Sequence, residues 1–413
     1  MQTSSSPITP STSSNSRLFK HKPFLLFFGA SGFSELAYQI AFVALGWQVY
    51  ALSGSAFDLG LIGLIQFLPS VLLVFVIGHA ADKYPRRPLV QICQLIEAAT
   101  ALYLAVGSIC GWLSVMNIFV SVGVLGMAMA FEGPAATALL PAVVPEGHLK
   151  EGTTVGSAIY QMGAISGPAI GGLAFAVSPS LPFILMFVLW VLAAVFNQGI
   201  KNDASAAQPD TPSSDSLFAG VSFIKNNPAI LGTLSLDLFA VLLGGATTLL
   251  PVYAKDILQT GPLGLGILRS APALGALLMT VYLSHFPLNK AVGLRMFQSV
   301  IAFGLATVFF AYSNLMWLSL LALFVMGAVD MVSVIIRSSL VQLSTPDDMR
   351  GRVNAVNFLF INTSNQLGGF ESGMTAALFG TVPAVAIGGV GTVLVALIWM
   401  KLFPSLKAVD KLE

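Results

Sequence analysis

Five charged side chains stand out because they lie inside stretches of sequence that are otherwise apolar: Glu35, Glu132, Asp237, Arg269 and Asp330. A charge at the centre of a bilayer costs about 2.5–3.5 kcal/mol on insertion scales, so such residues are candidates for function. A carboxyl group in such a place can take up a proton from one aqueous side and release it to the other. Glu35 and Asp237 lie near the middle of their stretches, at nearly equivalent places in two similar halves of the chain. We therefore predict these two as the preferred proton or cationic-substrate sites.

The same side chains also have structural interpretations. Each carboxyl group could instead pair with a buried cation or with a polar group on a neighbouring helix. Arg269 is either an anchor for an anionic substrate or a partner for Asp237, and Arg337 is expected to extend to the inner membrane face. Two further charges of this kind are Glu97 and Glu371.

Polar and amphipathic side chains in the same stretches complete the candidate pocket. They are Tyr38, Gln39, Gln66, Tyr160, Gln161 and Asn357. Their amide and phenol groups suit hydrogen bonding to an amphipathic solute, although packing between helices would explain them as well.

No constellation for catalysis or metal binding accompanies these residues. The four histidines fall at the edges of the apolar stretches: His21, His79, His148 and His285. Cys93 and Cys110 are 17 residues apart, and a helix of that length separates them by about 25 Å, too far for a disulfide. The chain also lacks the phosphate-binding pattern G-x-x-x-x-G-K-[ST]. We therefore predict no catalytic residues, no metal site and no cofactor.

The elements that must position these residues are membrane-spanning helices. Of the 413 residues, 56% are hydrophobic and 9% are charged, with a mean hydropathy of +0.85, whereas soluble proteins carry roughly 25% charged residues. The net charge of +1 leaves no basic surplus for nucleic-acid binding. Twelve stretches are long enough to cross a bilayer, near 24–50, 58–79, 89–110, 115–138, 154–176, 182–199, 229–252, 262–284, 294–312, 317–340, 353–375 and 382–403. The predicted fold is an all-α integral membrane protein with twelve helices.

The array divides into two halves of six stretches that resemble each other. At an offset of 203 residues, Gly63 matches Gly266 and Pro69 matches Pro272. At an offset of 201 residues, Gly126 matches Gly327 and Gly167 matches Gly368. A near-constant offset over two regions indicates duplication, and duplicated halves are typical of secondary transporters.

The polar segments between and around the halves set the expected domains and the orientation. We expect a disordered cytoplasmic tail at 1–22, six-helix bundles at 23–200 and 228–404, a cytoplasmic linker at 201–227 and a second tail at 405–413. With both termini in the cytoplasm, 16 of the 19 basic residues lie on the cytoplasmic side and only Lys255 lies outside. This distribution follows the positive-inside rule and predicts a multi-pass protein of the inner (plasma) membrane.

The loop after the second stretch reads GHAADKYPRRPLV, residues 78–90. It resembles the loop motif of the major facilitator superfamily, G-x-x-x-D-[RK]-x-[GP]-R-[RK], and the matching positions include Gly78, Asp82, Arg86 and Arg87. The resemblance implies a conformational latch, in which the Asp82 carboxylate meets the N-terminal end of the eleventh helix near Arg352. A carboxylate at a helix N-terminus gains roughly 0.3–1 kcal/mol from the helix dipole. By the same resemblance, the helices that carry Glu35, Glu132, Asp237 and Asp330 line a central cavity.

The fifth stretch carries the run GAISGPAIGG, with Gly163, Gly167, Pro168, Gly171 and Gly172. The run is similar to a superfamily motif associated with exporters that exchange substrate for protons. Close packing through small residues is the structural alternative.

Segments 46–73 and 344–360 are similar to the branch of the superfamily that contains the enterobactin exporter and macrolide efflux proteins. The resemblance implies a monomeric secondary transporter that exports amphipathic small molecules, drug-like or siderophore-like, by proton antiport with alternating access. Its partners would be the substrate, protons and the lipid bilayer. The alternatives are a proton-coupled importer of the same fold and, in a different class, a membrane enzyme or sensor.

Overall fold

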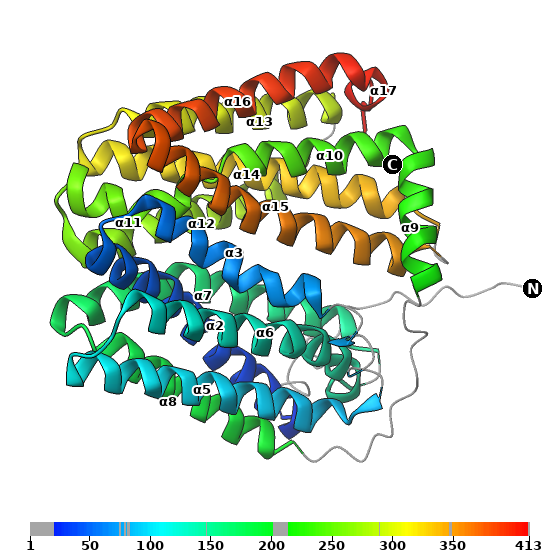
Figure 1. The fold of residues 1–413 in the computed structure, drawn as a ribbon. Coiled ribbons are helices and arrows are strands. Elements are labelled where there is room, and N and C mark those ends of the chain that lie inside the picture. The colour runs from blue at the N-terminus through cyan, green and yellow to red at the C-terminus, as the bar shows by residue number, and fades with distance from the viewer. Residues whose placement is uncertain are drawn as a thin grey trace, which may run out of the picture.

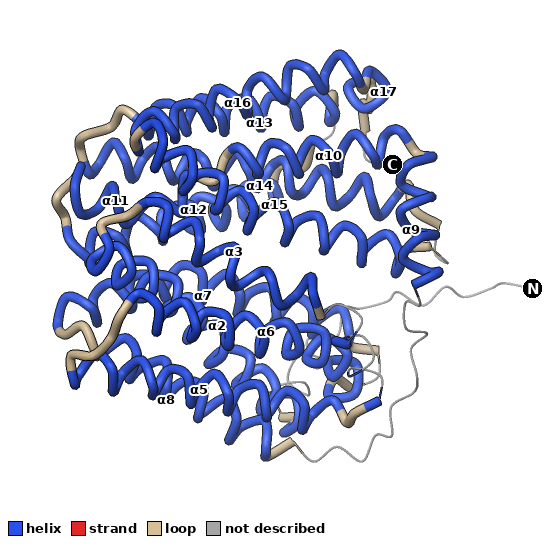
Figure 2. The backbone as a smooth tube through the Cα atoms, in the orientation of Figure 1, coloured by secondary structure: helices blue, strands red, loops and turns tan. Residues whose placement is uncertain are grey.

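The computed structural model describes residues 20–73, 76–77, 80, 83–145, 147–200, 214–288, 290–346 and 349–411. Every regular element in these ranges is a helix (Figures 1 and 2). The N-terminal bundle consists of α2 (Lys22–Ser53), α3 (Ala56–Leu72), α5 (Arg86–Cys110), α6 (Val115–Val143), α7 (Leu149–Val177) and α8 (Leu181–Gln198). The C-terminal bundle consists of α10 (Pro228–Leu243) with its continuation to Ile257, α12 (Gly261–His285), α13 (Val292–Ala311), α14 (Met316–Leu343), α15 (Arg350–Phe379) and α16 (Thr381–Leu402). These are the twelve predicted stretches.

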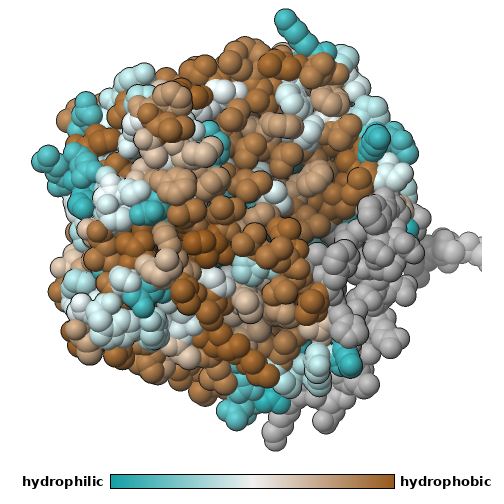
Figure 3. Space-filling model, in the orientation of Figure 1, coloured by the Kyte–Doolittle hydropathy of each residue, from teal (hydrophilic) through white to brown (hydrophobic). Residues whose placement is uncertain are grey.

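Lipid is the solvent for the outer faces of these helices. Within the described ranges, nine helices are both long and apolar enough to span a membrane. Large apolar side chains such as Leu72, Val177 and Leu378 are about 70% exposed, and the face in Figure 3 is mainly hydrophobic across its middle. The helices α7 and α15 are long but more polar, and both lie between the bundles, where α7 packs on α12 and α15 packs on α3. Their greater polarity goes with this position, in which one face of each helix contacts the other bundle.

The two bundles pack their helices in the same way. Gly126 of α6 lies against the backbone of Gln66 in α3, and Gly327 of α14 lies against the backbone of Pro272 in α12. The pairing of α2 with α7 has its counterpart in the pairing of α10 with α15. The duplication predicted from the sequence is therefore confirmed in the packing, where small residues let backbones approach closely.

The seventh predicted stretch differs from expectation, because it is not one continuous helix. After α10 ends, the chain forms a 3-10 turn at Ala246–Leu249, a short helix α11 at Leu250–Val252 and a π-helical turn at Tyr253–Ile257. Gly245 lies at the break, and a Cβ atom there would stand 2.5 Å from the Gly368 carbonyl oxygen of α15. The local departure from helix follows from this close approach and from Pro251, which cannot donate a backbone hydrogen bond.

Two segments expected as linker or tail contain helices in the part of the chain that the structure describes, which leaves out 201–213 of the expected linker. Helix α9 (Ser214–Asn226) occupies the end of the linker, and its Ile224 side chain is buried against the C-terminal bundle. After the short helix α17 (Pro404–Lys407), the Val409 carbonyl accepts a hydrogen bond from the Gly293 amide at 2.9 Å. Residues 404–410 therefore cap the start of α13, whose first amides have no partner within their own helix. Of the tail expected at 1–22, residues 1–19 lie outside the described residues, and Lys22 already belongs to α2.

Candidate functional site

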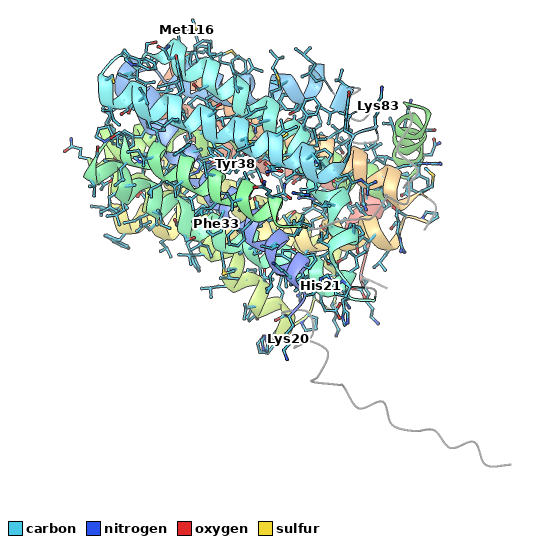
Figure 4. All side chains as sticks on the ribbon, turned by 90° about the horizontal axis from the view of Figure 1, so that it is seen from below. Lys20, His21, Phe33, Tyr38, Lys83 and Met116 are labelled. Carbon is cyan, nitrogen blue, oxygen red and sulfur yellow. The ribbon has the colours of Figure 1, made fainter. Side chains whose placement is uncertain are left out.

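A central pocket lies between the two bundles and takes side chains from both. It encloses about 690 Å³ of empty space, including a part that is open. Most of its lining is apolar or aromatic, with Phe42, Met129 and Trp190 from the N-terminal bundle and Pro251 from the C-terminal bundle. The polar groups in its lining include Tyr38, Gln66 and Arg269. Figure 4 shows Tyr38 near the middle of the molecule, with Lys20 and His21 towards one edge.

Arg269 is the cation of this pocket. Its guanidinium lies over the ring of Phe42, 4.5 Å from the ring centre, which is a favourable cation–π distance. Among the described residues, no carboxylate lies within 4.0 Å of Arg269. The alternative pairing of Arg269 with Asp237 is therefore wrong. The pocket therefore carries a positive charge that no carboxylate of the described chain neutralises.

Glu35 and Gln39 lie on the side of α2 that faces α7. The Gln39 amide donates a hydrogen bond of 2.7 Å to the Glu35 carboxylate. The glycines of the α7 run make room for these side chains, since a Cβ at Gly163 would stand 2.6 Å from Cγ of Glu35 and Gly167 lies against Gln39. Gly171 lies against the backbone of Ile40 in the next turn. The run therefore seats the acid-bearing face of α2 directly on α7.

The other side of the same run makes contact across the bundles. Gly172 lies 2.5 Å, measured from its ideal Cβ, from the carbonyl oxygen of Pro262 in α12. Nearby, the Gln161 amide donates to the Ala273 carbonyl at 2.6 Å and the Ser270 hydroxyl donates to the Ile165 carbonyl at 2.6 Å. Gln161 thus joins α7 to α12 and does not line the central pocket.

Glu132 belongs to a polar cluster within the N-terminal bundle. Its carboxylate accepts hydrogen bonds from Ser34 of α2 at 3.2 Å and from Gln94 of α5 at 2.9 Å. Glu97, one turn beyond Gln94, is completely buried beside it. The sequence singled out Glu132 and included Glu97 among the charges in apolar stretches, but it gave no role to Ser34 or Gln94, although Gln94 and Glu97 share a face of an apolar helix.

Asp237 and Asp330 lie together in a second pocket of the C-terminal bundle, with about 310 Å³ of empty space including a part that is open. Ser299 and Ser333 also line it. Asp237 forms an ion pair with Arg337, whose side chain is buried. The expectation that Arg337 extends to the membrane surface is therefore wrong, because a carboxylate on the facing helix binds it inside the bundle.

The predicted latch can be followed only in part, since Gly78 and Asp82 lie outside the described residues. Arg86 donates to the Ala138 carbonyl at 2.9 Å, and Arg87 donates to the Asn197 carbonyl at 3.1 Å. Both arginines therefore bind carbonyls near the C-terminal ends of α6 and α8, where cations are favoured. The Arg352 side chain is exposed at the start of α15. A latch between Asp82 and this helix stays a prediction.

The remaining predicted polar residues lie outside the lining of the central pocket. Tyr160 is 57% exposed on α7, and Asn357 of α15 has a buried side-chain oxygen without a hydrogen-bond partner in the described chain. Phe42, Met129 and Trp190 line the pocket without having been predicted. Phe42 follows Tyr38 by one helical turn, and the two ring centres are 4.7 Å apart. The four-residue spacing from Tyr38 in the sequence could therefore have predicted that Phe42 faces the pocket.

Comparisons with known proteins agree with this geometry. The family described as "Transmembrane secretion effector", a family of the major facilitator type, matches residues 13–412. The multidrug efflux pump Tap of Mycolicibacterium fortuitum is 25% identical over 358 residues, covering 82% of this chain and 85% of that protein. The enterobactin exporter EntS of Citrobacter koseri is 23% identical over 405 residues, covering 95% and 94%.

Solved structures show the same fold at lower identity. The nucleoside transporter NupG aligns with a TM-score of 0.70 at 17% identity, covering 92% of this chain and 98% of that one. A bacterial homologue of the iron transporter ferroportin, in an inward-facing state, aligns with a TM-score of 0.71 at 14% identity, covering 95% and 100%. The twelve-helix, two-bundle arrangement is therefore shared with transporters of different substrates.

Proposed function

Because this chain belongs to the major facilitator superfamily, in the family described as transmembrane secretion effectors, we propose that it exports amphipathic small molecules in exchange for protons. It is a multi-pass membrane transporter and not an enzyme. Two of its relatives carry the names of an efflux pump and an exporter, and their names support the outward direction. We propose the inner (plasma) membrane as its location, with a monomer as the working unit.

The observation that carries this proposal is the central pocket, which both bundles line. A site shared between two bundles opens to one side or the other when the bundles rock, which is alternating access. Small residues at the crossings of α3 with α15 and of α7 with α12 allow such rocking around close backbone contacts. We take 23–200 and 228–404 as the two moving bodies, the 201–227 segment as their cytoplasmic connection, and both termini as cytoplasmic.

The lining suggests the chemistry of the substrate. Phe42, Met129 and Trp190 offer apolar and aromatic surface to the body of the molecule. Arg269 offers a cation to a carboxylate, phenolate or other electron-rich group, because no carboxylate of the described chain neutralises it. Tyr38 and Gln66 add hydrogen bonds. An amphipathic molecule with an anionic end fits this pattern best.

Proton coupling is assigned to carboxyl groups near this pocket. Glu35 precedes Tyr38 by one turn and lies beside the Gly163–Gly172 run. Asp237 already has Arg337 as a partner, so it is a weaker candidate than Glu35, and Asp330 lies in the second pocket. A proton that moves down a potential of 100 mV supplies about 2.3 kcal/mol, which is enough to bias a cycle between two states.

The first test is accumulation of fluorescent probes and siderophores in cells that express the chain. We expect expression to lower accumulation, and a protonophore to restore it. If expression raises accumulation in a gradient-dependent way, the chain is an importer and the proposal fails.

The second test addresses Arg269. We expect Arg269→Gln to lose export of an anionic probe, 8-anilinonaphthalene-1-sulfonate, and Arg269→Lys to retain part of it. Export of the cationic probe ethidium should not decrease when Arg269→Gln removes the positive charge. Arg295→Gln is the matched control, because Arg295 is an exposed arginine of α13 away from the pocket. Equal loss of both probes in Arg269→Gln would show that Arg269 supports the fold and does not select charge.

A further inference from the structure

Glu97 of α5 is a carboxyl group buried without any conventional hydrogen-bond donor. Its exposed fraction is 0%, and neither of its carboxylate oxygens accepts a hydrogen bond from an amide, hydroxyl or cationic donor of the described chain. A buried polar group without a partner is rare, because its lost hydration is not replaced. The group that meets it is the Glu132 carboxyl of α6. Two carboxyl groups can hydrogen-bond to each other only when at least one of them carries a proton.

Among the described residues, no cationic side chain faces this pair. Neither Glu97 nor Glu132 has a lysine, arginine or histidine nitrogen of the described chain within 4.0 Å. The titratable groups that face the pair are Glu35 of α2 and Cys93 of α5. The helix α8, which packs against α5 from the other side, carries no titratable side chain.

A second observation comes from Gln94, which is not an acid. Its amide nitrogen donates to Glu132, but its side-chain oxygen is buried and has no donor, in a residue that is 2% exposed. Gln94 and Glu97, one turn apart on α5, therefore bury three acceptor atoms, both oxygens of Glu97 and the oxygen of Gln94, without a donor in the described chain. A proton on one of the two carboxyl groups would supply the hydrogen-bond donor that is missing between them. Two carboxylates side by side without a cation do not both stay ionised, so they share a proton.

We propose that Glu97 and Glu132 together bind one proton, and that this shared proton is the one exchanged for substrate. This rests on the proposed function for its role in transport. In the outward-facing state a proton leaves water on the outer side and bonds to a carboxylate oxygen of the pair. In the inward-facing state the same bond breaks and the proton enters the cytoplasmic water, while the substrate moves the other way. No other bond changes.

The contacts of Ser34 connect the pair to the central pocket. The Ser34 hydroxyl donates to Glu132, and the next residue along α2 is Glu35, which is bonded to Gln39 and half-buried beside Tyr38. A change in the charge of Glu132 therefore changes a hydrogen bond that holds α2, the helix that lines the pocket. The Gln39 amide donates a hydrogen bond to Glu35, which stabilises its ionised form, so Glu35 is suited to pass a proton on. Glu97 has no such donor, so the Glu97–Glu132 pair is suited to keep a proton bound.

Infrared difference spectroscopy of the purified full-length chain in proteoliposomes tests the proton directly, without any substrate. We expect a pH step to change the carbonyl stretch of a protonated carboxyl group, and both Glu97→Gln and Glu132→Gln to remove that signal. Glu371→Gln, which removes a carboxyl group of α15 that is bonded to Thr375, is the matched control and should keep it. Size-exclusion profiles check that each variant is folded, and the amide is nearly isosteric with a protonated carboxyl. If the signal survives in both folded variants, the pair does not hold the proton and the proposal is overturned.

A transport measurement separates this proposal from the proposed function. Proteoliposomes that contain the full-length chain are loaded with 8-anilinonaphthalene-1-sulfonate, and release of the probe is measured with and without an imposed pH gradient. We expect Glu97→Gln to release the probe down its own gradient but to lose the acceleration by the pH gradient. If the wild-type chain shows the infrared signal but no gradient-driven release, the pair binds a proton but that proton is not exchanged for substrate, and the exchange role is overturned. If Glu97→Gln still responds to the pH gradient as wild type does, the coupling role is overturned while export itself stands.

Discussion

The two bundles share their packing but differ in their buried charges. Gly126 and Gly327 make equivalent backbone contacts in the two halves. In contrast, among the described residues the N-terminal bundle holds Glu35, Glu97 and Glu132 without an ion pair, of which Glu97 is fully buried, whereas the C-terminal bundle carries Arg269 and the Asp237–Arg337 pair. The geometry of a duplicated fold is therefore symmetric while its chemistry is not. The half with three carboxyl groups outside any ion pair is suited to handle protons. The half with Arg269, which no carboxylate of the described chain neutralises, is suited to hold the anionic end of a substrate.

The largest expected effect comes from breaking the ion pair of the C-terminal bundle. Asp237→Asn should lower the free energy of unfolding by about 3–5 kcal/mol, because it leaves the buried Arg337 without its carboxylate. Thermal unfolding of the detergent-purified protein measures this loss. Adding Arg337→Met should recover most of it, since no charge then remains. Asp330→Asn in the same pocket is the control and should change little. Equal unfolding temperatures for wild type and Asp237→Asn would contradict the ion pair.

The symmetry of the packing can be tested with an added methyl group in each bundle. Alanine at 126 would place its Cβ 2.9 Å from Cα of Gln66, and alanine at 327 would place its Cβ 2.6 Å from Cα of Pro272. We expect each of Gly126→Ala and Gly327→Ala to cost about 1–3 kcal/mol of unfolding free energy. Gly133→Ala on α6, where no atom lies within 4 Å, should be neutral or stabilising. If only one of the two substitutions destabilises the protein, the close backbone contact is present in that bundle alone and the two bundles do not pack in the same way.

The ionisation state of Glu132 in the N-terminal bundle can be tested through its hydrogen bond from Ser34. A hydrogen bond to a neutral acceptor contributes about 0.5–1.5 kcal/mol, and one to a charged acceptor about 1.5–3 kcal/mol. Since we infer a shared proton on Glu132, Ser34→Ala should fall in the lower range when unfolding is measured at neutral pH. Ser157→Ala, whose hydroxyl bonds only to its own helix at Thr153, is the control. A value in the upper range would indicate that Glu132 is ionised.

The smallest expected effect concerns the ring beneath Arg269. Replacing Phe42 by leucine keeps an apolar side chain but removes a cation–π contact of about 0.5–1 kcal/mol. Binding of 8-anilinonaphthalene-1-sulfonate, measured by its fluorescence, should weaken by only a few-fold, with no change for ethidium. Phe57→Leu, which removes a ring packed on Phe370, is the control. If Phe42→Leu weakens both probes alike, the ring contributes surface and does not position the cation.

Much of the fold could be predicted from the sequence, because apolar stretches of bilayer length have few alternatives. The second stretch was expected from 58 and the helix begins at Ala56; the last was expected at 382–403 and runs from Thr381 to Leu402. Turn residues fix some of these ends, as where Gly54, at φ 63°, ends α2 and Ser55 caps α3. The break after Leu243 was not predicted, since it depends on a contact with Gly368 on a distant helix.

The candidate site was predictable only as a set of residue types. Glu35, Arg269, Tyr38 and Gln66 were singled out correctly as polar groups in apolar stretches, and the structure brings three of them into one pocket. Their partners could not be predicted. Arg337 was expected at the membrane surface but binds Asp237, which lies 100 residues earlier in the chain, and Gln161 binds a backbone carbonyl where a substrate contact was expected.

The sequence by itself therefore determined that this chain spans a membrane, that it is built from two similar halves, and which ionisable groups lie in its apolar stretches. Hydropathy, residue spacing and composition depend on local or repeated features of the chain, which need no knowledge of its tertiary contacts. Only the tertiary structure decided that Arg337 neutralises Asp237, that Arg269 faces the pocket, and that Glu97 meets Glu132. The reason is physical: in a low-dielectric interior the state of each charge depends on what lies within a few ångströms of it, and that is fixed by how the helices pack.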